Sequence, residues 1–312
     1  MRYFALIAPL LLIGCVRQEA SFPSRPITIV VPWAAGGGTD QLARIMAEEA
    51  AKIFGVGVNV LNRDGGAGTV GHIYGMKARP DGYTVTMVTY ELCSYKPLNR
   101  AQIGPGDYKA LLQLNEDPGA ITIHADSPWK TLKELIDYSR EHPKEITVGN
   151  SGPGAVWHIG AVKLENMTGV RFTHIPLDGA KPAVTRLLGK HIQAVAVSPA
   201  EVEQYVREGT FRCLGIMSEE RFADMPEVPT MQEQGIELVH GTWRGLAVHK
   251  ETPDDIAAKL ANGFKQAYDQ PSFQAAAKRM LMGLKYRNGE DFSKYMQKEA
   301  EDVAALITEL GL

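Results

Sequence analysis

Short apolar strands alternate with amphipathic helical segments along most of the chain, and this alternation constrains the fold more than any other feature. Residues 27–31 predict a strand, and residues 40–54 predict a helix with Leu42, Ile45 and Met46 on one face. Further strands are predicted at residues 58–61, 83–89, 111–114, 121–124, 146–149, 172–175, 194–197, 213–217 and 246–248. Strands that alternate with helices indicate α/β layers around mostly parallel sheets.

The length and the C-terminal pattern indicate two domains, one of them discontinuous. A chain of 312 residues is long for a single core, and domains of about 100–200 residues are usual. Residues 253–312 carry only helical patterns. We therefore expect the C-terminal helices to return and cover a sheet formed earlier in the chain.

Composition and charge exclude several classes of function. Hydrophobic residues make up 45% and charged residues 22% of the chain, as in an ordinary globular protein. The formal charge of −3 and the absence of a basic cluster argue against a nucleic-acid partner. The eight histidines show no close metal-ligand spacing, so neither a metal nor another cofactor is expected.

The N-terminus carries an export signal. Met1-Arg2 is followed by an apolar stretch over residues 3–13, which is shorter than the roughly 20 residues that span a bilayer. The stretch ends in Leu12-Ile13-Gly14-Cys15, which resembles the bacterial lipobox. We expect residues 1–15 to be a lipoprotein leader ending at a lipidated Cys15, and residues 16–21 to be a tether. The alternative is an ordinary signal peptide that contains a cysteine. Either leader predicts a periplasmic or other extracytoplasmic location.

Only Cys93 and Cys213 remain after the leader, and both fall in predicted strands far apart in sequence. Export would permit a disulfide between them. Buried strand thiols more often serve as small apolar fillers, and we expect the two to be unpaired.

A glycine-rich turn joins the first predicted strand to the first helix. It reads Pro32-Trp33-Ala34-Ala35-Gly36-Gly37-Gly38-Thr39-Asp40. Glycines expose backbone N–H groups and the helix N-terminus adds a positive dipole, so the turn is suited to a carboxylate or phosphate. It lacks the lysine of a nucleotide-binding P-loop. The alternative is a tight turn selected only for its geometry.

A second glycine-rich segment, Gly66-Ala67-Gly68-Thr69-Val70-Gly71, matches the dinucleotide fingerprint. A strand precedes it, and the acid Glu91 follows about 20 residues later. However, four residues separate the strand from the glycines, and an exported protein has no supply of nicotinamide cofactor. We interpret the segment as a structural turn.

Two later turns also follow predicted strands. One is Asn150-Ser151-Gly152-Pro153-Gly154, with His158 one helical turn further on, and the other spans residues 176–180. Turns at the carboxyl ends of parallel strands are where open α/β sheets bind ligands. His158 alone has a simpler explanation, as a satisfied helical histidine.

Taken together, these motifs resemble the extracytoplasmic substrate-binding proteins of tripartite tricarboxylate transporters, the TctC or Bug family. Matching segments include residues 23–27, the turn at 31–40, Pro80-Asp81-Gly82-Tyr83-Thr84 and Pro226-Glu227-Val228-Pro229-Thr230. The resemblance implies a two-domain Venus-flytrap of the type II periplasmic binding protein fold. Domain 1 would comprise residues 22–122 and 242–312, and domain 2 residues 123–241.

The resemblance also implies a ligand site for a small carboxylate between the domains. The candidate residues are Ala35, Gly36, Gly37, Gly38, Thr39, Asp40, Thr89, Tyr90, Ser151, Gly152, Gly154, His158, Asp178, Gly179 and Ala180. Glu91, Trp157 and Asp178 depart from the family pattern. One hypothesis is that Asp178 pairs with the ammonium group of an amino acid. The alternative is that Glu91 and Asp178 both face solvent.

Together with the leader, the resemblance implies a monomeric, lipid-anchored binding protein that captures a small carboxylate, an organic acid or an amino acid, and delivers it to membrane permease subunits. An exported hydrolase using Ser151, His158 and Asp178 is the alternative, because a serine nucleophile needs an adjacent base. Ser151 does not lie in a Gly-x-Ser-x-Gly elbow, and we expect no enzymatic activity.

Overall fold

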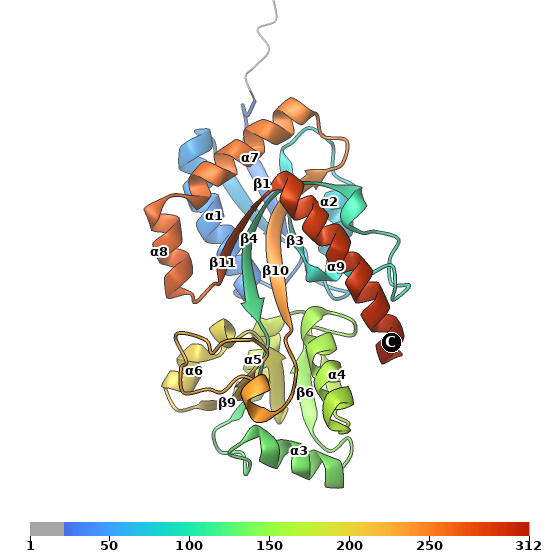
Figure 1. The fold of residues 1–312 in the computed structure, drawn as a ribbon. Helices are drawn as coiled ribbons and strands as arrows, with labels where there is room; N and C mark the ends of the chain where they lie inside the picture. Colours follow the sequence, from blue (N-terminus) through green and yellow to red (C-terminus); the bar gives the residue numbers. More distant parts are fainter. Residues whose placement is uncertain (1–21, 312) are drawn as a thin grey trace, which may run out of the picture.

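The computed structural model describes residues 22–311, which form two lobes, each built on one sheet (Figure 1). The sheet of the first lobe consists, in order across it, of β11 (Leu284–Asn288), β4 (Tyr108–Pro118), β10 (Gly241–His249), β3 (Thr84–Thr89), β1 (Ile27–Val31) and β2 (Val58–Asn62). The sheet of the second lobe consists of β7 (Thr173–Pro176), β6 (Thr147–Asn150), β8 (Ala194–Val197), β5 (Ala120–His124) and β9 (Phe211–Ile216).

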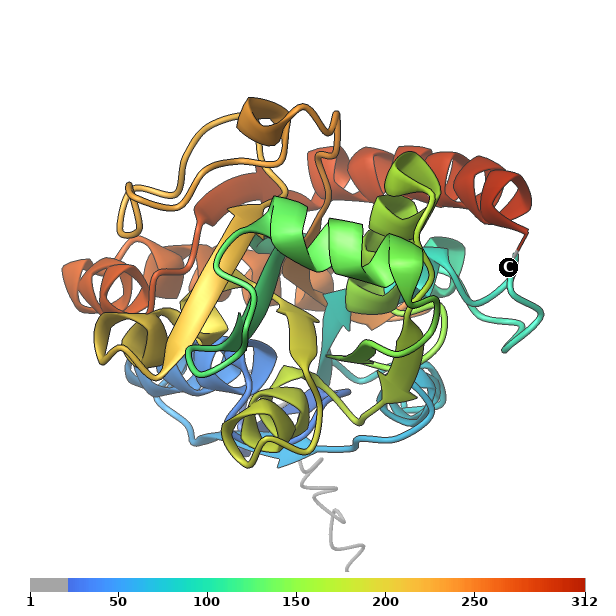
Figure 2. The same ribbon diagram turned by 90° about the horizontal axis from the view of Figure 1, so that it is seen from below.

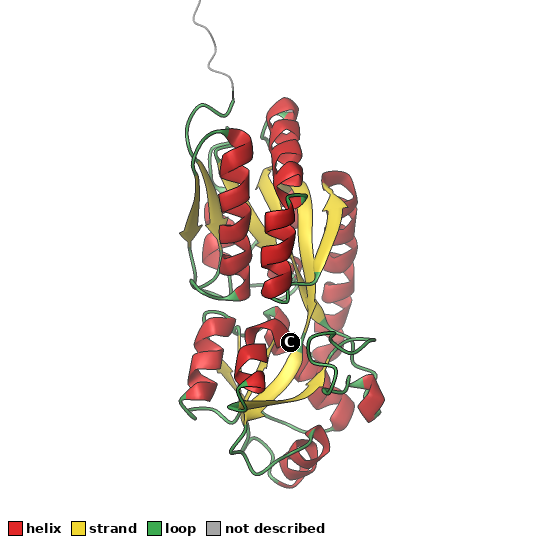
Figure 3. Ribbon diagram, turned by 90° about the vertical axis from the view of Figure 1, so that its left-hand side faces the viewer, coloured by secondary structure: helices red, strands yellow, loops and turns green. Residues whose placement is uncertain are grey.

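Helices cover both faces of the first sheet (Figure 3). The first lobe carries α1 (Gly38–Phe54), α2 (Thr69–Met76), α7 (Asp254–Tyr268), α8 (Pro271–Arg279) and α9 (Gly289–Leu310). Neighbouring residues of β3 point to opposite faces: Met87 packs with the α1 and α7 side chains, and Val88 packs with those of α9. Because both faces of the sheet are covered, the side chains on both sides of its central strands are buried, and the sequences of these strands are almost continuously apolar.

The second lobe carries α3 (Leu132–Glu141), α4 (Val156–Thr168), α5 (Ala180–Leu188) and the short α6 (Glu203–Arg207). Helix α3 has a side-chain cap, because the Thr131 hydroxyl accepts a hydrogen bond from the Glu134 N–H at 3.2 Å. Seen from the second-lobe end, α9 of the first lobe lies along one side of the molecule (Figure 2).

Three expectations about the strands were wrong. Both sheets are mixed rather than mostly parallel, because β10 lies antiparallel between β3 and β4, and β5 lies antiparallel between β8 and β9. The C-terminal region is not all helical, since β11 adds an edge strand whose residues are mostly half-buried or exposed, which hides its alternation. Cys93 lies in a 3-10 turn (Tyr90–Cys93), not in a strand.

The chain crosses between the lobes twice, and the crossings define the domains. It passes from β4 to β5 at residues 118–120 and returns to β10 at residues 240–241. The predicted boundary after residue 122 thus falls inside β5. We call residues 22–118 and 241–311 the first lobe, and residues 119–240 the second. The Gly119 N–H donates to the His240 carbonyl at 2.9 Å, so the two crossing segments are hydrogen-bonded to each other.

Cys93 lies in the first lobe and Cys213 in the second, and both thiols are free and buried. Cys15 and the predicted leader and tether lie outside the described residues. Within residues 22–311, no helix combines the length and the apolar character needed to cross a bilayer.

The Gly66–Gly71 segment packs closely against the end of β1. A β-carbon on Gly71 would lie 2.5 Å from Pro32 Cα and 2.6 Å from the Arg63 carbonyl oxygen. Gly68, at φ +84°, precedes the first residue of α2. The glycines are therefore needed for a close backbone approach between α2 and the first loop.

Candidate functional site

A small cavity lies between the lobes, at the carboxyl ends of β1, β3, β6, β7 and β8. Its volume is about 30 Å³, which is the space of roughly one water molecule. It is lined by Trp33, Ala34, Gly37, Gly38, Thr39, Glu91, Ser151, Val156, Trp157, Gly179, Ala180, Lys181, Glu201, Thr242 and Arg244. Strand ends from both sheets thus converge on one point, the usual position of a ligand site in open α/β sheets.

The loop after β1 is held in shape by the buried Asp40. Its carboxylate accepts hydrogen bonds from the Gly36 N–H at 2.8 Å, from Arg44 at 2.9 Å and from the Asn62 amide at 2.9 Å. Although burial acts in the opposite direction, these bonds lower the pKa of Asp40. The side chain therefore fixes the loop and does not face the cavity.

Glu91 reaches from the first lobe to the second. It is 1% exposed, and its Oε1 accepts a hydrogen bond from the Val156 N–H, the first residue of α4, at 3.0 Å. Its Oε2 accepts a hydrogen bond from the Thr89 hydroxyl at 2.5 Å. Burial raises the pKa of Glu91, and the two hydrogen bonds oppose the shift. Because α4 has no side-chain cap from its own sequence, a carboxylate of the other lobe occupies this anion-binding helix end.

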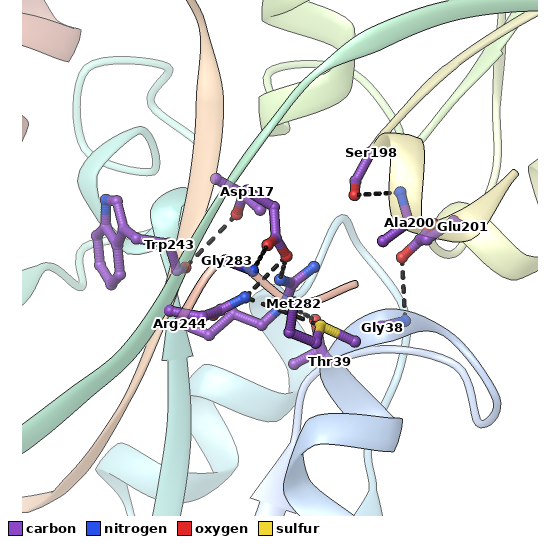
Figure 4. A network of polar contacts seen from close by, with 12 residues as sticks. Gly38, Thr39, Asp117, Ser198, Ala200, Glu201, Trp243, Arg244, Met282 and Gly283 are labelled. Carbon is purple, nitrogen blue, oxygen red and sulfur yellow. Dashed lines mark hydrogen bonds and ion pairs between the residues drawn. The ribbon is translucent and has the colours of Figure 1, made fainter. Parts of the chain in front are cut away.

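Glu201 makes the reciprocal contact from the second lobe to the first. It ends a short 3-10 turn (Pro199–Glu201) after β8, and its Oε1 accepts a hydrogen bond from the Gly38 N–H at the start of α1, at 3.0 Å (Figure 4). Its Oε2 is buried and has no hydrogen-bond partner. Burial raises the pKa of Glu201, and the nearby Arg244 guanidinium opposes the shift.

Arg244, on β10, supplies the buried positive charge of the site. It forms an ion pair with Asp117 of β4, and both residues are 3% exposed. Its Nε donates to the Thr39 hydroxyl at 2.9 Å (Figure 4). Asp117 also accepts hydrogen bonds from the Gly283 N–H at 2.8 Å and the Asn115 amide at 2.7 Å. Additional hydrogen bonds of this kind, made by both members of the pair, offset the cost of burying an ion pair.

The structure places six of the predicted site residues at the cavity. These are Gly37, Gly38, Thr39, Ser151, Gly179 and Ala180. The others do not line it: Ala35, Gly36, Asp40, Thr89, Tyr90, Gly152, Gly154, His158 and Asp178.

The second-lobe turn explains part of this difference. A β-carbon on Gly152 would lie 3.4 Å from Ala67 Cβ, and one on Gly154 would lie 2.0 Å from Leu98 Cδ1. Both glycines therefore pack directly against the first lobe instead of facing a ligand. His158 Nδ1 accepts a hydrogen bond from the Gly154 N–H at 3.0 Å, so the histidine closes its own turn. Burial lowers the pKa of His158 to about 4, with a further contribution from His174.

The side chains of three other predicted site residues, Thr89, Tyr90 and Asp178, do not line the cavity. The Thr89 hydroxyl donates a hydrogen bond to the Glu91 carboxylate. The Tyr90 ring packs edge-to-face against the His240 ring, with a distance of 5.6 Å between the ring centroids. The Asp178 side chain is exposed, while its backbone carbonyl accepts a hydrogen bond from the Ala34 N–H at 3.4 Å. The hypothesis that Asp178 pairs with a ligand ammonium is therefore not supported. The alternative was wrong for Glu91, which is buried at the site.

The described residues show neither the arrangement that a serine hydrolase needs nor one that would hold a metal ion. The Ser151 hydroxyl is buried and has no hydrogen-bond partner, so it does not contact His158 as a nucleophile contacts its base. Among residues 22–311, no group of three or more His, Cys, Asp or Glu side chains is arranged to hold a metal ion.

Sequence reasoning missed Glu201, Arg244, Lys181 and Thr242. Arg244 had a visible signal, because it is the charged residue in an apolar strand, Gly241–His249. Glu201 had one too: Ser198-Pro199-Ala200-Glu201 is a fourth segment that follows a strand and precedes a helix.

Comparison with known proteins gives consistent matches along the chain. The family described as "Tripartite tricarboxylate transporter family receptor" matches residues 42–312. A Cupriavidus necator protein, described as a UPF0065 protein in the gbd 5' region, is 34% identical over 298 residues, which cover 95% of this chain and 90% of that protein.

Solved structures agree. A TctC solute-binding protein from Polaromonas, solved with no ligand, is 38% identical, with a TM-score of 0.68 over 93% of this chain and 100% of that one. The periplasmic binding protein BugD is 28% identical, with a TM-score of 0.89 over 93% and 99% of the two chains. MatC from Rhodopseudomonas palustris, solved with bound malate, is 26% identical, with a TM-score of 0.86 over 92% and 100%. These relatives are substrate-binding proteins rather than enzymes, and the predicted two-domain periplasmic binding protein fold is confirmed.

Proposed function

The chain belongs to the tripartite tricarboxylate transporter family of receptors, and on this basis we propose that it captures a small carboxylate between its lobes and delivers it to membrane permease subunits. The single observation that best supports this function is the convergence of strand ends and helix N-termini from both lobes on one cavity. Malate bound to MatC supports the ligand class.

The second lobe offers an anion site at the start of α5. This helix begins at Ala180 after Gly179, and no side chain caps its first N–H groups. Gly179 adopts φ +122°, a conformation that favours glycine, and this places the helix end beside Trp33 of the first loop. A ligand carboxylate bound here would meet free N–H groups and the positive end of the helix dipole.

Capture requires the lobes to move. Ligand pockets usually enclose about 300–1,000 Å³, and the cavity of about 30 Å³ is far smaller. Three hydrogen bonds hold the lobes together across it, from Gly38, Val156 and Ala34 to the facing lobe. We infer that the described arrangement is a closed form, and that the ligand enters when the lobes separate about the two crossing segments.

The test is binding of carboxylates by the purified protein, measured by calorimetry and thermal unfolding. The panel contains malate, succinate, citrate, benzoate and L-aspartate. A carboxylate present at 100 times its dissociation constant should add about 2.7 kcal/mol to the free energy of unfolding. If no carboxylate binds, the proposed function is wrong.

Two serines give a matched pair of variants. S151A removes an unpartnered buried hydroxyl from the cavity wall, so it should weaken carboxylate binding without lowering stability. S139A removes a hydroxyl of α3 that donates to the Leu135 carbonyl at 2.7 Å, so it should lower stability and leave binding unchanged. The opposite pattern would place the ligand elsewhere.

Membrane attachment through a lipid on Cys15 is a second part of the proposal, supported by the Leu-x-Gly-Cys ending of the leader. Growth of the expressing bacteria with radiolabelled palmitate should label the wild type and not C15S. Label on neither protein would indicate an ordinary signal peptide. Delivery to a permease by a monomeric receptor predicts that deletion of the membrane subunits abolishes uptake of the ligand and leaves its binding intact.

A further inference from the structure

The carboxylate of Glu201 is only half satisfied, and this distinguishes it from the other buried acids of the site. Its Oε1 accepts the Gly38 N–H at 3.0 Å, whereas its Oε2 is buried without a partner. A carboxylate oxygen removed from water needs a donor, preferably a charged one. The vacant acceptor therefore points to a donor that the chain itself does not supply.

A second unpartnered polar atom lies on the same cavity. Ser151 is 2% exposed, lines the cavity and has a hydroxyl oxygen without a hydrogen-bond partner. It comes from the second lobe, as Glu201 does, but from a different strand end. Two independent buried polar groups that lack partners at one cavity indicate a polar occupant.

Glu201 also meets a positive charge without pairing with it. A β-carbon on Gly38 would lie 2.8 Å from Glu201 Oε1 and 3.2 Å from Arg244 Nη2, so both head groups lie over the same residue. Within residues 22–311, Arg244 forms its ion pair with Asp117 and none with Glu201. The site thus presents a negative group and a positive group near Gly38. Figure 4 shows Glu201 bonded to Gly38, and Arg244 bonded to Asp117 and Thr39.

A larger cavity, here called the outer cavity, adjoins the small one, and Glu201 lines both. The outer cavity has a volume of about 270 Å³. Gly37, Gly38, Lys181 and Glu201 line both spaces. The outer cavity alone is close to the lower limit of about 300 Å³ for ligand pockets. A rotation of the Glu201 side chain or a small opening of the lobes would join the two spaces.

The charges around the cavity disfavour a ligand that is purely anionic. Two carboxyl groups, of Glu91 and Glu201, and two cationic side chains, of Arg244 and Lys181, line the cavity, and Asp117 next to it already pairs with Arg244. A dicarboxylate would add two negative charges to this group, and like charges at short range repel each other. An amino acid brings its own positive charge.

We propose that the cleft selects a small carboxylic acid that also carries an amino group, with the ammonium hydrogen-bonded to Glu201 Oε2. This inference rests on the proposed function, because it assumes that the ligand occupies the cleft between the lobes. The ligand carboxylate lies against the N-terminus of α5, within reach of Ser151 and the Arg244 guanidinium. The ammonium donates to Glu201 and replaces the missing partner of its Oε2.

The test compares acids that differ only by an amino group. Calorimetry measures binding of L-aspartate against succinate, and of L-alanine against propionate, to the wild type. Because a hydrogen bond between two charged groups is among the strong ones, at least one amino acid should bind about tenfold or more tightly than its partner.

The variant E201Q identifies the residue responsible. Glutamine keeps an oxygen that can accept the Gly38 N–H, so the closed form is retained while the charge is lost. In E201Q the preference for the amino member should fall to about threefold or less. The control E208Q changes an exposed acid of the same segment, whose carboxylate accepts a hydrogen bond from Gln204, and should keep the full preference.

Each other result overturns the inference. If neither amino acid binds more tightly than its partner without the amino group, the zwitterion inference is wrong and the proposed function stands. If E201Q retains the full preference for the amino acid, another group binds the ammonium and the assignment to Glu201 is wrong. If no acid of either kind binds, both the inference and the proposed function fail.

Discussion

Glu91 and Glu201 make the same contact in opposite directions across the cleft, yet their environments differ. Glu91 extends from the first lobe and caps α4 of the second, and Glu201 extends from the second lobe to the start of α1 in the first. Both carboxylate oxygens of Glu91 accept hydrogen bonds, from Val156 and Thr89. Only one oxygen of Glu201 does.

The difference separates a structural role from a binding role. A fully hydrogen-bonded buried carboxylate has little to gain from a ligand, so Glu91 acts as a fixed bridge between the lobes. A carboxylate with an unpartnered buried oxygen gains a donor when a ligand arrives, which is why we propose a binding role for Glu201. Four predictions test this contrast.

The largest effect is expected from Arg244, the cation that lies nearest to Glu201. R244M leaves Asp117 buried without its ion-pair partner, and such a change costs about 3–5 kcal/mol of the free energy of unfolding. Denaturant titration measures the loss. The double variant D117N/R244M removes both charges and should be more stable than R244M alone. A loss below about 1 kcal/mol in R244M would show that the pair is not buried in solution.

The two glutamates should differ in their contribution to stability. E91A leaves the Val156 N–H and the Thr89 hydroxyl without their acceptor, at a cost of about 1–3 kcal/mol. E201A removes one acceptor together with an unsatisfied oxygen, so its cost should be smaller. Denaturant titration of both variants without ligand decides the point. Equal losses would contradict the contrast between the two residues.

Gly38 and Gly37 offer a matched test of the Glu201 contact. A β-carbon on Gly38 would lie 2.8 Å from Glu201 Oε1, whereas one on Gly37 would meet nothing nearer than 3.7 Å. G38A should push the flexible Glu201 side chain away and loosen closure by about 1 kcal/mol, the net value of one hydrogen bond. G37A should leave closure unchanged. Small-angle scattering of the unliganded variants, read as radius of gyration, should show an increase only for G38A.

The last prediction concerns the pH dependence of stability. Burial raises the pKa of Glu201 in the folded protein, so the folded state holds its proton more tightly than the unfolded state does. Stability from this group is present below the unfolded pKa of about 4.3 and is lost as pH rises from there through the folded pKa. The difference in unfolding free energy between E201Q and the wild type should therefore increase in favour of E201Q as pH rises. The slope is at most about 1.4 kcal/mol per pH unit. A difference that stays constant from pH 4 to 7 would contradict the raised pKa.

Most of the fold could be predicted because local patterns and tertiary structure agree. Residues 27–31 and 194–197 are buried strands in the structure as in the prediction. The edge strand Leu284–Asn288 could not be recognised, because its residues are mostly half-buried or exposed and it pairs only with β4. Pairing partners more than a hundred residues apart also left strand direction unspecified, so the antiparallel β10 was not foreseen.

The site was predictable where backbone geometry makes it and less so where side chains do. Gly37, Gly38 and Gly179 line the cavity, and glycines before a helix expose the backbone N–H groups that favour an anion. The glycines at 152 and 154 looked the same in sequence, but they contact Ala67 and Leu98 of the other lobe. Whether a glycine turn meets a ligand or a protein surface depends on the angle between the lobes, which no local pattern encodes. The pairing of Arg244 with Asp117 likewise joins residues 127 apart in sequence.

The two crossing segments lie side by side and are joined by hydrogen bonds, with a glycine on each. A β-carbon on Gly241 would lie 2.3 Å from the Asp117 carbonyl oxygen, so no larger residue fits between the strands there. Within residues 22–311 these two segments are the only covalent links between the lobes, so any change in the angle between the lobes has to be absorbed by the backbone there.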